Sequence, residues 1–142
     1  MTKKPWWLFR QSAAIPYLKE NYDVKIVIVT TNSKESWTIP KGVIERFLTP
    51  SESAAQEALE EAGVSGDISD ELFSEYTYEK WGGTCHVQVY PLSVNEIFDN
   101  WKEDSKRSRK IVTIEQAIVL VKPRQKEILR NFSKFIHSLI KF

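Results

Sequence analysis

The spacing of hydrophobic residues changes along this chain between the two-residue period of β-strands and the longer period of helices. Residues 24–30 are rich in β-branched side chains and bounded by asparagines, so they predict a strand buried on at least one face. Residues 9–17 have the small and apolar side chains of another strand, in which Pro16 indicates an edge position or an end. Shorter strands are predicted at residues 37–39, 64–68, 70–78 and 85–94, and two late helices at residues 113–121 and after Pro123.

A further helix, predicted at residues 50–62, carries the clearest start and end of any element. Thr49 is placed to cap it, Pro50 occupies its first position, and Glu52 completes a capping box. Gly63 supplies the residue that can turn left-handed after the last helical position. The helical period then predicts an apolar face of mostly small side chains, formed by Ala55, Ala58, Leu59 and Ala62.

Three carboxylates, those of Glu57, Glu60 and Glu61, fall within an arc of about 100° on the side of this helix opposite the apolar face. Such carboxylates repel one another, and a solvated helix usually relieves the repulsion with Lys or Arg one turn away. Residues 49–63 contain no basic residue. A bound cation explains this pattern, and oxygen ligands suit Mg²⁺ or Mn²⁺ bridging to phosphate. An ordinary acidic solvent face is the alternative.

The spacing of residues 42–64 resembles the Nudix box, in which a glycine turn leads into a glutamate-rich helix. The positions that match the box are Gly42, Glu57, Ala58, Glu60, Glu61, Gly63 and Val64. Two positions differ, because Leu48 stands where the family has its first glutamate and Gln56 stands where it has an arginine. Within the family the chain is similar to the bacterial relatives of diphosphoinositol polyphosphate phosphohydrolases, on the basis of residues 10–14, 76–91 and 101–121.

This resemblance implies an α/β fold, an α/β/α sandwich with a mixed β-sheet, and a divalent-metal-dependent pyrophosphohydrolase that cleaves a phosphoanhydride bond. The implied metal ligands are Glu57, Glu61 and the backbone carbonyl of Lys41, and the implied metal is Mg²⁺ or Mn²⁺. Glu60 is the implied proton acceptor, although close carboxylates share their titration and leave the base among the three glutamates open. The implied substrates are small polyphosphorylated molecules of the diadenosine polyphosphate or diphosphoinositol polyphosphate type.

Several basic positions are expected near the substrate phosphates. The Lys41–Gly42 turn is expected to reach them, while Arg10 and Arg46 are either phosphate ligands or ordinary surface residues. Four positive charges within residues 106–110 would also suit a polyphosphate, but we interpret this run as a solvated loop. No aromatic residues interleave with it, as base stacking on RNA would require.

Length and composition narrow the class of protein. At 142 residues with 42% hydrophobic content, residues 1–142 are expected to form one domain. A formal net charge of +1 argues against a nucleic-acid partner or an anionic membrane surface. No stretch has the apolar length of a transmembrane helix or of a signal peptide. A single cysteine excludes an internal disulfide, which fits a cytoplasmic protein, and the oligomeric state stays open.

The two departures from the box leave other functions open. Leu48 cannot bind a metal ion, and Gln56 can donate a hydrogen bond to a carboxylate but brings no charge, so we expect activity that is retained and attenuated. A Nudix-fold ligand sensor that has lost its chemistry is the first alternative. An RNA-end pyrophosphohydrolase is the second, and turnover of small substrates against capped or triphosphorylated RNA would distinguish them.

Overall fold

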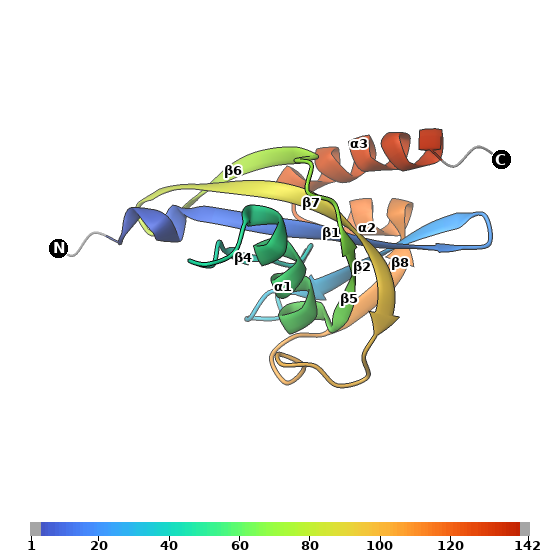
Figure 1. Ribbon diagram of the computed structural model, residues 1–142, viewed down its shortest axis with the longest axis horizontal. Coiled ribbons are helices and arrows are strands. Elements are labelled where there is room, and N and C mark those ends of the chain that lie inside the picture. The colour runs from blue at the N-terminus through green and yellow to red at the C-terminus, as the bar shows by residue number, and fades with distance from the viewer. Residues whose placement is uncertain (1–3, 140–142) are drawn as a thin grey trace.

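The computed structural model describes residues 4–139, which form a mixed β-sheet of eight strands covered by helices (Figure 1). The elements in chain order are η1 (Trp6–Phe9, a 3₁₀ turn), β1 (Arg10–Glu20), β2 (Asp23–Thr30), β3 (Trp37–Thr38), β4 (Lys41–Val43), α1 (Pro50–Ala62), β5 (Val64–Ile68), β6 (Ser74–Lys80), β7 (Gly83–Ile97), β8 (Arg109–Thr113), α2 (Ile114–Leu120) and α3 (Pro123–Leu139). The sheet order is β3-β2-β1-β7-β5, with β4 paired to β1, β6 to β7 and β8 to β2. Strands β1 and β7 run parallel, and the other named pairs are antiparallel.

Both faces of the sheet are buried, because alternate residues of its central strands point to opposite sides and both sides are apolar. The layer under α2 and α3 includes Ala13, Ile15, Ile26, Ile28, Leu129 and Phe132. The layer under α1 includes Ala14, Val27, Val29, Ala54, Ala58 and Ala62. The α/β/α sandwich expected from the family resemblance is therefore confirmed, with α1 on one face and α3 on the other (Figure 1).

Pro16 lies within the central strand β1, so the prediction that it marks an edge or an end is wrong. On one side β1 changes partner at this point: residues 11–13 pair with β4 and residues 17–20 pair with β2. The N–H of Ala14 points to that side, where it donates to the carbonyl of Pro40. Two residues further on, Pro16 faces the same side at the gap between the two partners, where a missing N–H breaks no ladder hydrogen bond.

Helix α1 begins and ends as predicted, with the Thr49–Glu52 capping box formed and Gly63 left-handed at φ 65°. Its buried face differs from the prediction. Leu59 is 38% exposed and Ala54 is buried in its place. Glu61 is buried as well, because this face of α1 packs on the edge where β4 meets the helix. The prediction that all three glutamates lie opposite the buried face is therefore wrong for Glu61.

Two short strands, β4 and β8, were not predicted from the sequence. Strand β4 pairs with residues 11–13 of β1, and β8 pairs with β2 across residues 25–29. The loop between β7 and β8 consequently returns beside the C-terminal end of α1, where the N–H of Phe98 donates to the carbonyl of Gly63 (Figure 1). Among residues 4–139, no helix is both long enough and apolar enough to cross a bilayer.

Candidate active site

Glu57 packs directly on the backbone of Gly42. A Cβ atom at residue 42 would collide with the Glu57 carboxyl group, so glycine allows α1 and β4 to approach this closely. The Glu57 carboxyl has no hydrogen-bond or ion-pair partner within residues 4–139. Burial, followed by repulsion from Glu61 and Glu60, raises its pKa to about 8. Without a cation, Glu57 therefore holds a proton at neutral pH.

Glu61 is the most buried of the three glutamates, and both of its oxygens have partners. Oε1 accepts the backbone N–H of Lys41 at 3.0 Å, and Oε2 pairs with the Arg107 guanidinium at 3.0 Å. Burial nevertheless raises the pKa of Glu61 to about 7, because the desolvation of its charged form outweighs the stabilisation by Arg107 and the Lys41 N–H. Glu61 thus joins helix α1, strand β4 and the 98–108 loop.

Arg107 is buried between the sheet and α1, so the interpretation of the whole 106–110 run as a solvated loop is wrong. Besides Glu61, its guanidinium donates to Glu103 at 2.8 Å and to the carbonyl of Thr30 at 2.9 Å. Arg109 is also turned inward, where it donates to the carbonyls of Ala62 and Phe98 at 2.9 and 2.8 Å. Both arginines leave water because their guanidinium groups make charge-assisted hydrogen bonds to the carboxylates and helix-end carbonyls of this region.

Glu60 is held by two donors and lies nearer the surface. Gln56 donates to it at 2.8 Å, which confirms the hydrogen bond predicted for the residue in the box arginine's place. Lys102, from the 98–108 loop, pairs with the other oxygen at 2.8 Å. The hydrogen bond from Lys102 is the main reason that the pKa of Glu60 is lowered. The positive charge that position 56 lacks is therefore supplied from another part of the chain.

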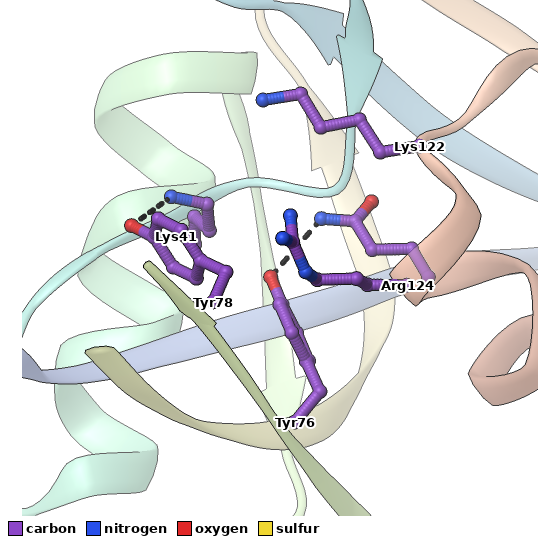
Figure 2. Close-up of a pocket in the computed structure, with 6 residues that line it drawn as sticks. Lys41, Tyr76, Tyr78, Lys122 and Arg124 are labelled. Carbon is purple, nitrogen blue, oxygen red and sulfur yellow. Dashed lines mark hydrogen bonds between the residues drawn. The ribbon is translucent and has the colours of Figure 1, made fainter. Parts of the chain in front are cut away.

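Lys41 and Gly42 face opposite sides of β4, because successive residues of a strand point in opposite directions. While its neighbour Gly42 faces Glu57, the Lys41 amino group reaches Tyr78 Oη at 2.9 Å (Figure 2). It also lies 3.4 Å from Gln11 Oε1. Tyr78 in turn donates to Gln11 at 2.9 Å. Burial, with help from the charge of Lys80, lowers the pKa of Lys41 to about 8.

Arg10 and Arg46 lie in a separate place from Lys41. Both are exposed and line a wide cleft of about 610 Å³, in which Leu48 forms part of the wall. Arg10 lies 6.0 Å from the ring centroid of Trp6, whose neighbour Trp7 also lines the cleft. The structure therefore brings together the carboxylates and Lys41 around Gly42, and places the two arginines in an aromatic cleft next to them, since the cleft begins at Val43.

A family model described as the NUDIX domain matches residues 8–132. The chain belongs to the Nudix family. It is 34% identical over 102 residues to Nudix hydrolase 16, mitochondrial, of Arabidopsis thaliana, covering 67% of this chain and 57% of that protein. It is 28% identical over 127 residues to diphosphoinositol polyphosphate phosphohydrolase 2 of Rattus norvegicus, covering 86% and 69%.

Solved structures agree on the fold. A C. elegans Ap4A hydrolase binary complex superposes with a TM-score of 0.76 at 20% identity, covering 91% of this Nudix chain and 98% of that one. The Nudix chain spans little more than half the length of the Arabidopsis relative. The fold is thus shared with the C. elegans structure.

The site of this Nudix protein offers a hard divalent cation the donors that it prefers, carboxylate and carbonyl oxygens. Glu57 in particular is a partly buried carboxyl without a partner in residues 4–139, and its pKa is raised first by burial and then by repulsion from Glu61 and Glu60, which a cation would offset. No three His, Cys, Asp or Glu side chains within residues 4–139 are arranged as a metal cluster. In this conformation Glu61 faces Arg107 and the Lys41 amide.

Sequence reasoning missed the residues that the 98–108 loop contributes to this Nudix site. Glu103 lies near enough to raise the pKa values of Glu57 and Glu61, and its N–H donates to the carbonyl of Glu60 at 3.0 Å. Lys102 and Arg107 pair with two of the box glutamates. The only signal in the sequence was the charge density of this loop, which does not say where a charge points.

Proposed function

We propose that this protein hydrolyses a phosphoanhydride bond of a small polyphosphorylated molecule with the help of Mg²⁺ or Mn²⁺. The observation that carries the proposal is the partly buried carboxyl of Glu57, which has no partner within residues 4–139, beside the buried Glu61. Close carboxyl groups with pKa values raised to about 8 and 7 are costly to ionise without a cation and well suited to bind a divalent one. The names of the hydrolase relatives support the same class of reaction.

Glu57, Glu61 and the carbonyl of Lys41 would hold the metal ion, which when bound stabilises charge on the phosphates and acidifies water. Glu60 is proposed to accept the proton of the attacking water, because its lowered pKa keeps it ionised at neutral pH. The water oxygen bonds to phosphorus while the bridging P–O bond breaks, and the leaving phosphate departs as an anion. The proton passes from Glu60 to solvent, so the carboxylate is restored.

For the rest of the substrate, the cleft beside Val43 favours a nucleotide. Trp6 and Trp7 offer flat aromatic surfaces of the kind on which bases stack, while Arg10 and Arg46 bring positive charge for phosphates. We therefore propose a dinucleoside polyphosphate first and a diphosphoinositol polyphosphate second, the two types named in the Ap4A hydrolase structure and the rat relative.

The rival function is a ligand sensor that binds such molecules without cleaving them. Leu48 favours it, since an apolar wall in place of a glutamate removes one possible metal ligand. Against it, the charge missing at Gln56 is supplied by Lys102 and Arg107. We propose that catalysis is retained at a lower rate.

Turnover of a substrate panel tests this proposal. Purified protein is assayed with Mg²⁺ or Mn²⁺ on diadenosine polyphosphates, diphosphoinositol polyphosphates and triphosphorylated RNA, beside the Glu60→Gln and Glu61→Gln variants. Glu115→Gln is the matched control, since Glu115 is an exposed residue of α2. Cleavage that both site variants abolish and the control retains is expected. Binding without product release would instead support the sensor, and a marked preference for RNA would replace the small-molecule substrate.

A further inference from the structure

We propose that Lys122 and Arg124, together with Lys41, form an anion-binding pocket for a terminal phosphoryl group of the substrate. The assignment of this group to the substrate rests on the proposed function, whereas the pocket itself is argued from its own geometry. Six residues line it: Lys41, Tyr76, Tyr78, Lys122, Arg124 and Gln125. Figure 2 shows the side chains of Lys122 and Arg124 extending from the start of α3 toward Lys41.

Within residues 4–139, the cations of this pocket have no ion-pair partner. There the Lys41 amino group bonds only to the neutral side chains of Tyr78 and Gln11. Lys122 and Arg124 make no hydrogen bond or ion pair within residues 4–139, and Arg124 only stacks 5.8 Å from the ring of Tyr78. Unused guanidinium and ammonium donors that converge beside a half-buried tyrosine are the usual chemistry of an oxyanion site.

The wall behind these cations is held rigid. Gln125, which is fully buried, accepts the N–H of Ile39 at 3.0 Å and donates to Thr38 at 2.8 Å and to Tyr76 at 3.1 Å. These bonds tie the first turn of α3 to the chain just before β4. The backbone that carries Lys122 and Arg124 is thus held in place relative to that of residues 38 and 39, just before Lys41.

The size of the pocket limits what enters it. Its volume is about 20 Å³, room for about one water-sized group, so a single phosphoryl oxygen fits inside while the rest of the anion stays at the opening. The backbone N–H of Lys41 meanwhile bonds to Glu61, so this one residue contributes its amino group to the pocket and its amide to the carboxylate site.

Binding of inorganic tripolyphosphate, measured by calorimetry with EDTA present, tests the pocket without catalysis. The variant is Lys122→Met/Arg124→Met, and the matched control is Arg130→Met/Lys134→Met, which removes the same charge from exposed positions of the same helix. We expect affinity to fall by at least about tenfold in the first and to change little in the second. Lys122→Met alone, at a residue whose side chain makes no hydrogen bond or ion pair within residues 4–139, provides a variant that keeps the fold and is expected to weaken binding in part.

Citrate is titrated in parallel, to separate phosphoryl anions from carboxylates. Equal loss of affinity in both double variants, or citrate binding as tight as that of tripolyphosphate, would overturn the pocket assignment. The two proposals fail separately. A protein that cleaves no anhydride but loses tripolyphosphate binding in the pocket variant refutes the catalytic proposal alone. One that cleaves an anhydride with KM unchanged in that variant refutes the pocket alone.

Discussion

Replacing Arg107 with methionine is expected to lower the free energy of unfolding by about 3 kcal/mol at neutral pH. The guanidinium is only 11% exposed and donates to Glu61, to Glu103 and to the carbonyl of Thr30. Methionine fills much of the same space but offers no donor. The variant therefore leaves a buried carboxylate and a carbonyl without their partner, and that loss dominates the change.

The magnitude follows from how far each partner can recover its hydration. Removing one member of a buried ion pair costs about 3–5 kcal/mol. The Glu103 side chain is 19% exposed and can regain water, whereas that of Glu61 is 6% exposed and keeps only the Lys41 N–H. This places the cost at the lower end of the range. For a chain of this length, about 3 kcal/mol corresponds to a fall in Tm of roughly 10 °C.

The effect also has a predicted pH dependence. Arg107 lowers the pKa of Glu61, which is about 7 in the intact site, so the pKa rises further in the variant. The folded variant therefore keeps Glu61 protonated up to a higher pH than wild type does. Its free energy of unfolding falls relative to wild type as pH increases through that range. The difference between the two proteins is therefore expected to change little below about pH 6, where Glu61 is protonated in both, and to grow as pH rises through 7.

Urea unfolding of Arg107→Met beside Lys106→Met measures this contribution. Lys106 is the exposed neighbour in the same loop, so its replacement removes the same charge without the buried pair. The Arg107→Met/Glu61→Gln double variant completes a cycle, in which the cost of losing Arg107 should shrink because Glu61 is neutral. Equal unfolding midpoints for Arg107→Met and Lys106→Met would refute the reasoning.

Two other predictions concern Gly42 and Glu57. Gly42→Ala should reduce turnover about as much as Glu57→Gln while moving Tm by only a few degrees. The reason is that the atoms displaced by the new Cβ are the flexible end of the Glu57 side chain. Turnover assays and thermal denaturation of both variants check this. The free energy of unfolding should fall as pH rises toward 8, since folded Glu57 keeps a proton up to a pKa of about 8, above its ordinary 4.5. Urea titrations of Glu57→Gln should show a flatter dependence, and an unchanged slope would contradict this assignment.

Local features were predictable from the sequence. The start and end of α1, its capping box and the left-handed Gly63 agree with the structure. The same holds for the presence of strand β2 and of helix α3 after Pro123. The Nudix box also falls in this class, and the family match confirms it. Each of these depends on bonds or spacings within a few residues, which the order of side chains already contains.

Tertiary structure alone decided which charges are paired and which are left open. The sequence by itself determined that α1 would carry three close glutamates, but not that Glu61 would be buried or that Arg107 would reach it from the loop before β8. Nor did it indicate that Lys122 and Arg124 would face Lys41. These arrangements follow from the pairing of β4 with β1 and of β8 with β2, contacts between segments distant in the chain. Burial then determines how much each ion pair contributes to stability, because a carboxylate removed from water needs a partner, and only the folded chain brings that partner to it.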